Sequence, residues 1–357
     1  MLHVDPEPGW GGGEAQVLAL LAELGTRGVA LRLAAHPEGR LARTAAARGV
    51  PLVPLRVRNH ADLGAALALR RLVPGHDVVH FHTARAHALA PLCRGRGARL
   101  VVTRRMDYVP AGGPYARFLY NRAVDVVIAI SEGVRQALLR AGVRDERIRV
   151  VPSGVDPDAW VVPAGAGAGL RAEWGLTPDD VVVLVLGALE RRKGHAVLLE
   201  AAARLRAGHN RLRYVFCGDG GEADALARAA APLGPGVVRF AGFRGDVAAC
   251  LAAADVVALP SLHEGLGVAA LEAMAAGRAV VASRVGGLVE AVAEEETGLL
   301  VAPGDARELG AALGRLAADA ALRRRFGAAG RARVHARYTT ARMAEGTLAC
   351  YGEAPCA

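Results

Sequence analysis

Lysine, aromatic residues and long apolar runs are scarce in this sequence of 357 residues. Of its 44 basic residues only Lys193 is a lysine, and the aromatic residues make up 4%. No apolar run approaches the roughly 18 residues of a membrane-spanning helix. The arginines form no block of like charge, and the aromatic residues are too few to alternate with them for base stacking. We therefore expect no transmembrane segment and no nucleic acid partner.

Cysteine patterns and targeting signals indicate a compartment. The five cysteines are odd in number and form no Cys-x-x-Cys pair. No signal peptide pattern is present, so we expect a cytoplasmic protein in a reducing environment.

Small apolar residues and arginine, by contrast, are abundant. Hydrophobic residues make up 52% of the chain, and its length predicts about two globular domains. The formal net charge of +9 favours an anionic partner, such as a phosphorylated ligand or an anionic membrane surface.

Apolar runs typical of buried strands alternate with helix-like segments through both halves. The first half contains LHV, VALRLAA, DVVHFH, LVVT, DVVIAI and IRVVP, and the second contains VVVLVLG, RYVFCG, VVRFAG, DVVALP, AVVAS and GLLVA. Continuous apolar strands predict parallel sheets that are covered on both faces. We expect an α/β protein of two doubly wound, Rossmann-like domains facing a central cleft, where a ligand binds.

A stretch rich in proline, alanine and glycine at residues 161–169 is typical of a linker. The expected domains are residues 1–162 and 170–335. Residues 336–357 have helical spacing and are expected to cross back to the first domain.

Lys193 lies in the loop Gly187-Ala-Leu-Glu-Arg-Arg-Lys-Gly194, between an apolar strand and a helical pattern. An ammonium group at the carboxyl end of a parallel strand is a suitable partner for a diphosphate. The alternative is an exposed lysine that only contacts water.

A second segment places two carboxylates around a glycine turn. Glu264 precedes Gly265 and Gly267, and Glu272 lies in the second turn of the helix that follows. The glycines allow close approach of the backbone, and the free amides at the helix start attract an anion. Ionised glutamate accepts hydrogen bonds only, so it suits sugar or ribose hydroxyls. For either glutamate alone, a solvated side chain beside a loop is the simpler interpretation.

These segments together resemble glycosyltransferase family 4, whose members have the GT-B fold. The resemblance covers nearly the whole chain and is most specific in HEGLG with its two glutamates. The other matching segments are GGGE at 11–14, DVVHFH, AISEGV, VVPSGVD, LGALERRKGH, the run from AGFRGD to EAMAAG, VASRVGGLVE and TGLLVAPGD.

The resemblance implies retaining transfer of a sugar from a nucleotide diphosphate sugar to an acceptor hydroxyl. Glu272 matches the glutamate that binds the nucleotide ribose, and Glu264 matches the one that contacts the donor sugar. Lys193 and Arg192 match the cations that hold the diphosphate.

Backbone amides complete the implied donor site: those of the turn at Gly12 and Gly13, and those of Leu266 and Gly267 at the start of the second helix. With these cations and amides we expect no metal and no other cofactor. The only Asp-x-Asp, at residues 156–158, falls at the domain junction and is interpreted as part of a turn.

The sequence departs from the family pattern after the LVV strand. Many members have Thr-x-His where this chain has Thr103-Arg104-Arg105. His82 and His87 are candidates to replace the missing histidine, His82 in catalysis and His87 at the acceptor, although buried structural histidines are the alternative.

Arg104 and Arg105 precede the aromatic segment YVPAGGPYARFLY and are candidates for binding an anionic acceptor. A sugar or lipid-linked acceptor of cell-envelope glycan or lipopolysaccharide assembly is the hypothesis, with peripheral contact to an anionic inner membrane face. An ordinary mobile loop with solvated arginines is the alternative.

Two other classes of function remain open. A GT-B sugar-nucleotide 2-epimerase would share the phosphate grip but needs no acceptor. A non-catalytic protein that binds nucleotide sugars or anionic polymers would not turn over a donor. A dinucleotide-dependent dehydrogenase is disfavoured because no G-x-G-x-x-G turn is present.

Overall fold

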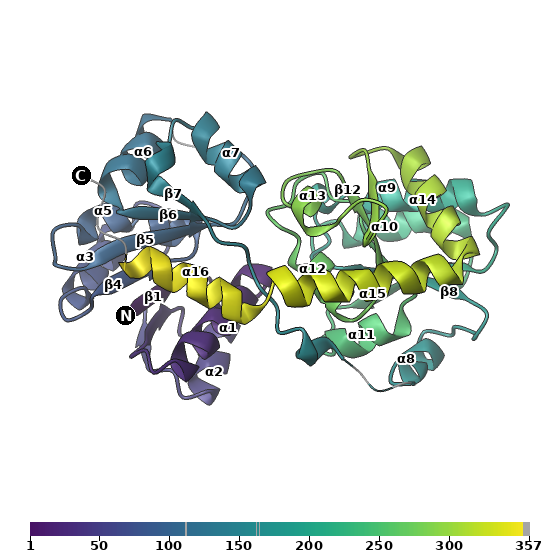
Figure 1. Cartoon of the computed structure of the whole chain (residues 1–357), viewed down its shortest axis with the longest axis horizontal. Coiled ribbons are helices and arrows are strands. Elements are labelled where there is room, and N and C mark those ends of the chain that lie inside the picture. The colour runs from purple at the N-terminus through teal and green to yellow at the C-terminus, as the bar shows by residue number, and fades with distance from the viewer. Residues whose placement is uncertain (111–112, 162, 164, 353–357) are drawn as a thin grey trace. The chain divides into compact units, whose positions relative to one another are not determined.

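The computed structural model describes residues 1–110, 113–161, 163 and 165–352. The chain forms two compact units (Figure 1). Unit 1 comprises Met1–Gly154 and Thr340–Ala357, and unit 2 comprises Val155–Thr339. Across the described residues, no helix has the length and hydropathy needed to cross a bilayer.

Unit 1 contains a parallel sheet of seven strands in the order β3-β2-β1-β4-β5-β6-β7. The six apolar runs expected in this half are strands, and the central residues of all but β7 are buried because helices cover both faces. The strands are β1 (Leu2–Asp5), β2 (Arg32–Ala35), β3 (Leu52–Pro54), β4 (Val78–Phe81), β5 (Arg99–Arg104), β6 (Val126–Ala129) and β7 (Ile148–Val150).

Strand β3 was not expected from the sequence. It has three residues, ends in a proline and lies at the edge of the sheet, where a missing amide donor is tolerated. It is only partly buried, so it lacks the apolar run that marks the central strands.

The helices of unit 1 lie on the two faces of this sheet (Figure 1). Helices α1 and α16 pack together over one face, with a core that includes Leu24, Val101, Met343 and Tyr351. The helical segments are α1 (Gly12–Thr26), α2 (Arg40–Ala47), α3 (Leu63–Leu72), α4 (Ala84–His87), α5 (Ala90–Cys93), α6 (Pro114–Phe118), the π-helical turn η1 (Leu119–Ala123), α7 (Glu132–Arg140), η2 (Asp145–Arg147) and α16 (Thr340–Gly352).

Unit 2 contains a parallel sheet of six strands in the order β10-β9-β8-β11-β12-β13. All six apolar runs expected in the second half are strands. They are β8 (Val181–Leu186), β9 (Leu212–Cys217), β10 (Val238–Gly242), β11 (Val256–Leu259), β12 (Ala279–Ser283) and β13 (Gly298–Val301).

The largest core of unit 2 joins the sheet to α9 and α14 and includes the buried rings of Tyr214, Phe216 and Phe326. The helical segments are η3 (Asp158–Trp160), α8 (Ala168–Glu173), η4 (Arg191–Lys193), α9 (His195–Leu205), α10 (Ala223–Ala230), η5 (Ala231–Leu233), α11 (Val247–Ala253), α12 (Val268–Ala275), α13 (Leu288–Ala291), α14 (Ala306–Ala318) and α15 (Ala320–Arg337).

The boundaries of the units differ from those of the linker pattern. The first lies between Gly154 and Val155, ahead of the stretch at 161–169, and the second lies between Thr339 and Thr340. Helix α16 therefore counts with unit 1, and it packs on α1 of the same unit.

Each sheet has one place where the order of strands reverses. In unit 1 it lies between β1 and β4, and in unit 2 between β8 and β11. Loops at the carboxyl ends of such neighbouring strands diverge and leave room for a ligand. The loops after these four strands carry most of the residues that the sequence singled out.

Candidate functional site

The loop that carries Lys193 is fixed against the end of β11. Gly194 has φ +66°, and a Cβ there would stand 1.9 Å from the carbonyl oxygen of Pro260. Glycine allows this approach because it has no side chain and adopts positive φ without strain. The Leu262 amide also donates to the Arg192 carbonyl at 2.7 Å. The two loops that follow β8 and β11 are thus joined through their backbones.

Lys193 and Glu264 form an ion pair at the carboxyl edge of the unit 2 sheet. Lys193 Nζ lies 2.5 Å from Glu264 Oε2, and the side chains are 15% and 11% exposed. Ser261 donates its hydroxyl to the same carboxylate oxygen at 3.2 Å. The neighbouring Arg192 is more exposed and donates from Nε to Glu190 at 2.6 Å. The structure therefore brings Lys193 and Glu264 together, while Arg192 pairs with Glu190.

The glycine turn after Glu264 leads directly into α12. Gly267 has φ +84°, and a Cβ there would stand 2.4 Å from Leu288 Cδ2, so only glycine fits. Gly265 accepts a hydrogen bond from the Gly287 amide at 3.0 Å, and Leu266 is buried. The turn thus places the positive end of α12 beside the ion pair, where it attracts an anion.

Glu272 lies in the second turn of α12 and is half-buried. Burial raises the pKa of its carboxyl to about 8. Its carboxylate has no hydrogen bond or ion pair with the residues that the structure describes. A carboxyl group that lacks protein partners can form hydrogen bonds with ligand hydroxyls in either protonation state.

The glycine turn of unit 1 begins α1. Gly11 donates its amide to Glu14 Oε2 at 2.7 Å, which closes one side of the helix start. Gly12 and Gly13 have ordinary backbone angles, and a Cβ on Gly12 would meet no atom within 4 Å. The free protein therefore does not need glycine at position 12, which is consistent with a role in close approach of a ligand.

Arg105 lies beside this turn, with its side chain against Gly13. Burial lowers the pKa of Arg105, and the charges of Asp5 and Glu14 oppose that effect. Burial also raises the pKa of Asp5 to about 7, and the nearby Glu14 charge adds to the rise. One Asp5 oxygen is buried without a hydrogen bond partner. A buried cation beside a carboxyl that protonates near neutral pH can accommodate an added anion.

His82 belongs to a buried group of three histidines on β1 and β4. It is 2% exposed, and its Nε2 lies 3.0 Å from His3 Nδ1. His82 Nδ1 lies 3.5 Å from the Arg105 guanidinium, which can only donate, so Nδ1 accepts and Nε2 carries the proton. Burial holds the pKa of His82 well below its usual range. This geometry suits His82 to positioning Arg105.

His80 connects the same group to the last helix. Its Nδ1 is 2.6 Å from the Tyr351 hydroxyl on α16, and its Nε2 is 2.7 Å from the Thr103 hydroxyl. Burial lowers the pKa of His3 to about 3 and that of His80 well below its usual range. The sequence analysis did not identify His3 and Asp5 as site residues. Their alternation in Leu2-His3-Val4-Asp5 places both on one face of a strand, and this pattern could have indicated that they lie near the histidines of DVVHFH.

Arg104 and Arg105 lie on opposite faces of the unit 1 sheet, as consecutive residues of an extended chain do. Arg104 is 6% exposed and its guanidinium lies 4.8 Å from the centre of the Tyr108 ring. His87 is buried beside it, with Nδ1 3.2 Å from the Tyr120 hydroxyl, and burial lowers the pKa of His87 to about 3. Arg104 thus contacts Tyr108 and Arg105 contacts His82, but the groups are close enough that the Arg105 charge also lowers the pKa of His87.

The group of His3, His80 and His82 is the one place among the described residues where three ligand atoms lie within 4.8 Å of one another. The Arg105 guanidinium contacts His82, and its positive charge opposes a bound cation. Both ring nitrogens of His80 also form hydrogen bonds, one with the Tyr351 hydroxyl and one with the Thr103 hydroxyl. These contacts favour a structural hydrogen-bond network over a metal centre.

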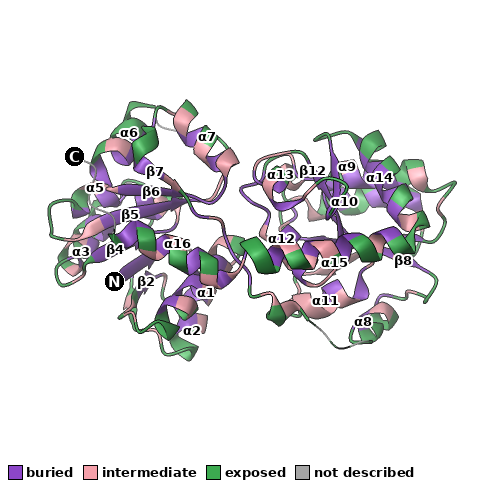
Figure 2. Ribbon diagram, viewed as in Figure 1, coloured by how far each residue is buried: buried purple, intermediate pink, exposed green. Residues whose placement is uncertain are grey.

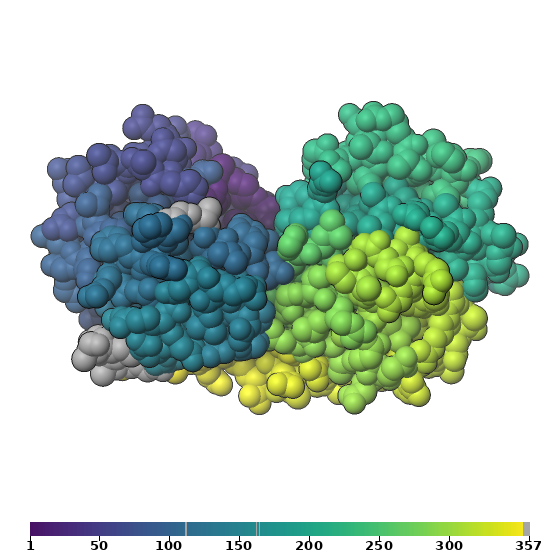
Figure 3. All heavy atoms as spheres, turned by 90° about the horizontal axis from the view of Figure 1, so that it is seen from above, coloured from purple at the N-terminus to yellow at the C-terminus, as the bar shows by residue number. Residues whose placement is uncertain are grey.

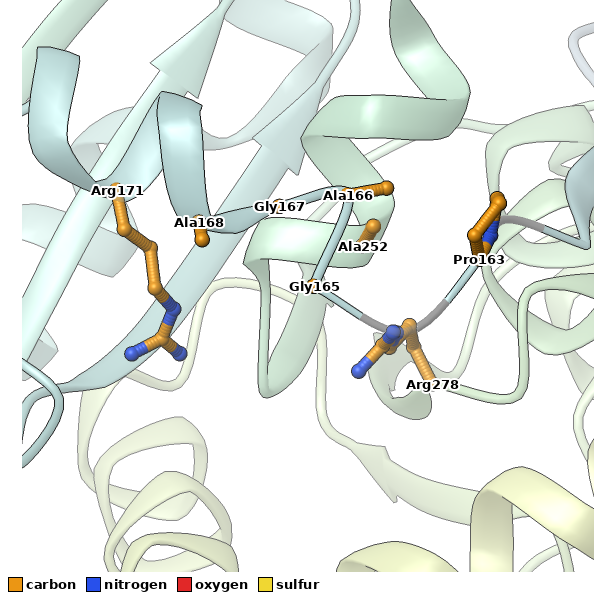
Figure 4. A pocket seen from close by; sticks show the side chains of 8 residues that line it. All are labelled: Pro163, Gly165, Ala166, Gly167, Ala168, Arg171, Ala252 and Arg278. Atoms are coloured by element: carbon orange, nitrogen blue, oxygen red, sulfur yellow. The ribbon is translucent and has the colours of Figure 1, made fainter.

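A cavity of about 280 Å³ lies at the other edge of the unit 2 sheet (Figure 4). Arg171 and Arg278 line it, and Arg171 pairs with Asp255 at 2.6 Å. Asp255 precedes β11, whereas Glu264 follows that strand, so the cavity is remote from the ion pair of Lys193. Arg171 donates a hydrogen bond to the Ala253 carbonyl at the end of α11, and Arg278 donates to the carbonyl of the next residue, Ala254.

Two doubly wound parallel units are the architecture expected of a GT-B glycosyltransferase, and the lysine–glutamate pair lies at the switch point of the second sheet. A cyanobacterial protein, Anabaena Alr3699/HepE, has this fold. Its crystal structure with UDP and glucose superposes with a TM-score of 0.87 over 99% of each chain, at 22% identity.

Residues 10–159 match the model described as Glycosyltransferase Family 4, and residues 169–333 match Glycosyl transferases group 1. The chain belongs to glycosyltransferase family 4 and is a glycosyltransferase. This membership favours transfer over the epimerase and the non-catalytic binding protein considered above.

Two curated relatives illustrate the range of the family. The α-maltose-1-phosphate synthase of Mycolicibacterium smegmatis is 32% identical over 351 residues, covering 89% of this chain and 86% of the relative. The lipopolysaccharide core biosynthesis glycosyltransferase LpsE of Rhizobium meliloti is 34% identical, covering 77% of this chain and 72% of the relative.

Proposed function

We propose that this glycosyltransferase moves a sugar from a nucleotide diphosphate sugar to an acceptor hydroxyl with retention and without a metal ion. The observation that carries the proposal is the pair of Lys193 and Glu264 beside the turn at Gly267. One small region presents a cation and helix amides for phosphates, and carboxylates for hydroxyls. The UDP and glucose in the Anabaena structure support a donor of this class.

In the proposed complex the diphosphate approaches the Lys193 ammonium and the start of α12. Glu264 stays beside Lys193 and accepts hydrogen bonds from hydroxyls of the donor sugar. Glu272 accepts hydrogen bonds from the ribose, and the amides of Gly12 and Gly13 face the phosphates. Each role matches the hydrogen-bonding capacity of the group concerned.

Cleavage of the bond from the anomeric carbon to phosphate leaves an oxocarbenium-like sugar and a diphosphate that gains negative charge. Lys193 and the α12 amides stabilise this charge more strongly in the transition state than in the bound donor. Arg192 is partly exposed and can exchange Glu190 for a phosphate oxygen. A cation that is already in place removes the need for a divalent metal at the leaving group.

We propose that the acceptor binds unit 1 at Arg105, whose guanidinium contacts His82 and lies in the electrostatic field of Asp5. An acceptor with a phosphate or carboxylate suits this buried cation. Assembly of a cell-envelope glycan or lipopolysaccharide is the proposed pathway, supported by the name of the Rhizobium relative. The proposed location is the cytoplasm, with peripheral contact to the inner face of the membrane.

Thermal shift against a panel of nucleotide sugars identifies the donor, because a saturating ligand stabilises the folded protein by a few kcal/mol at about 100 times its Kd. Transfer with the identified donor is then followed by release of nucleotide in the presence and absence of EDTA. We expect EDTA to leave the rate unchanged and NMR of the product to show the anomeric configuration of the donor. Loss of activity in EDTA with recovery in manganese, or an inverted product, would refute the proposal.

A further inference from the structure

Exposed apolar side chains are concentrated in one part of unit 1. Among the described residues twelve large hydrophobic side chains are exposed, and seven of them lie between residues 63 and 118. Leu63 and Leu67 on α3 are 67% and 51% exposed, and Phe118 on α6 is 51% exposed. Leu92 on α5 and Tyr115 on α6 are also exposed. These five residues are called the apolar band.

The helices that carry the apolar band are neighbours. Helix α3 packs on α5, and α5 packs on the turn η1 that continues α6. The Arg70 guanidinium donates to the Leu92 carbonyl, and the Tyr115 hydroxyl donates to the Ala88 carbonyl at 3.3 Å. Exposed residues mark the outer sides of α3 and α6 in Figure 2, and Figure 3 views unit 1 from the side of α6 and α7. The band therefore belongs to one continuous helical layer.

The charges around the band are mainly positive. Residues 63–122 contain ten arginines against two acidic residues, Asp77 and Asp107. Arg71, Arg94 and Arg96 are exposed on α3 and just after α5, and Arg94 lies 3.5 Å from Asp125. Arg104 and Arg105, which the sequence suggested for contact with a membrane, are not part of this surface because both side chains are largely buried.

We propose that the apolar band and its exposed arginines dock unit 1 on an anionic lipid bilayer. Leucine and phenylalanine side chains enter the interfacial region, the Tyr115 ring lies at the level of the headgroups, and the arginines attract anionic lipid. A second copy of the chain is a poor occupant, since two basic faces repel each other. The inference deepens the proposed function, because a lipid-linked acceptor would be met at this surface.

Helix α15 provides an internal comparison. It exposes Arg324 and Arg325 and has no acidic residue, but none of the exposed large hydrophobic side chains of the described chain lies on it. If positive charge alone determined binding, α15 would attract an anionic membrane as strongly as the arginines of unit 1. The combination of apolar area and positive charge occurs on the apolar band.

Flotation of the full-length protein with lipid vesicles tests the proposal. We expect binding to vesicles of phosphatidylglycerol and phosphatidylcholine, weaker binding in high salt, and none to phosphatidylcholine alone. Leu63→Ser/Leu67→Ser should weaken binding about tenfold or more, since both leucines lose their apolar contact. Arg71→Gln/Arg96→Gln should weaken it by a similar factor.

Two control variants change equivalent residues of unit 2: Val289→Ser for apolar area and Arg324→Gln/Arg325→Gln for charge. We expect both to bind vesicles like the wild type. Wild type that stays unbound at low salt, or α15 variants that weaken binding as much as the unit 1 variants, would overturn the proposal. A dimer in sedimentation that Leu63→Ser/Leu67→Ser dissociates would assign the band to a second copy instead.

Nucleotide release from the donor in vesicle-free solution separates this inference from the proposed function. We expect Leu63→Ser/Leu67→Ser to retain the wild-type rate there. A protein that binds vesicles but never releases nucleotide would refute the transferase mechanism and leave the docking surface intact.

Discussion

Lys193 Nζ lies 2.5 Å from Glu264 Oε2, although the two residues are far apart in the sequence and belong to loops after different strands. The contact depends on adjacent β8 and β11 and on Gly194, whose missing side chain admits the Pro260 carbonyl. The fold therefore holds together the cation and the carboxylate that we propose bind the phosphate and hydroxyl groups of the donor.

The ion pair predicts non-additive effects of mutation. Lys193→Met and Glu264→Gln should each lower the free energy of unfolding by about 2 kcal/mol, between the values for exposed and fully buried pairs. The double variant should lose about 1 kcal/mol less than the sum, because the second change removes a group that already lacks its partner. Urea unfolding of the three variants measures this, and strict additivity would show that the pair is not coupled.

Glu272 predicts a dependence of stability on pH. Its pKa is about 8 in the folded protein and near the ordinary 4.5 when unfolded, so the folded state binds its proton more tightly. The stabilisation is complete below the unfolded pKa and is lost as pH rises through the folded pKa. Between pH of about 5 and 8.5 wild type should lose about 2 kcal/mol more than Glu272→Gln, a figure reduced for partial exposure.

Urea unfolding at the two pH values measures that difference, with Glu296→Gln as the control for an exposed glutamate of the same unit. Parallel losses in wild type and Glu272→Gln would show that burial does not protonate this carboxyl.

The opposite orientations of two neighbouring arginines predict opposite outcomes. Arg105→Gln should raise the KM for an anionic acceptor about ten- to a hundredfold, the value of a lost charge-assisted hydrogen bond. Arg104→Gln should leave that KM unchanged, since Arg104 lies with Tyr108 and His87 on the other face of the sheet. Neither change should alter the thermal shift caused by the donor. Equal effects of both variants on the acceptor KM would contradict the assignment.

Substitutions at Gly194 and Gly12 should affect different properties, the first the stability of the fold and the second the binding of the donor. Gly194→Ala should destabilise unit 2 by several kcal/mol, because its Cβ would overlap the Pro260 carbonyl at a positive φ. Gly12→Ala should leave the unfolding midpoint nearly unchanged, since its Cβ meets no atom, yet it should reduce the thermal shift caused by the donor. A Gly12→Ala variant that binds the donor like the wild type would remove this turn from the proposed donor site.

The sequence was most informative where a long apolar run determines a buried strand. Twelve of the thirteen strands follow such runs, and the exception is β3, a partly buried edge strand with a proline. The region of Lys193 and Glu264 was also predictable, because strand order and glycine turns bring those loops together. The fold class needed the resemblance to a family as well as the periodicity.

Side-chain environment was less predictable. The sequence grouped Arg104 with Arg105 and gave His82 a catalytic role, but burial depends on which face of the sheet each residue occupies and what covers it. Helix α16 covers the histidines, and Tyr351 reaches His80 across 271 positions of the chain. Neither contact has a local sequence signal.

The return of α16 to unit 1 has a consequence for biosynthesis. Met343, Ala344, Cys350 and Tyr351 complete a core whose other members come from the first 151 residues. A ribosome therefore finishes all of unit 2 before it supplies the last helix of the unit 1 core, so Leu24 and Val101 stay uncovered until α16 has been synthesised. A nascent chain stalled ahead of Thr340 should be a good client for chaperones that bind exposed apolar surface.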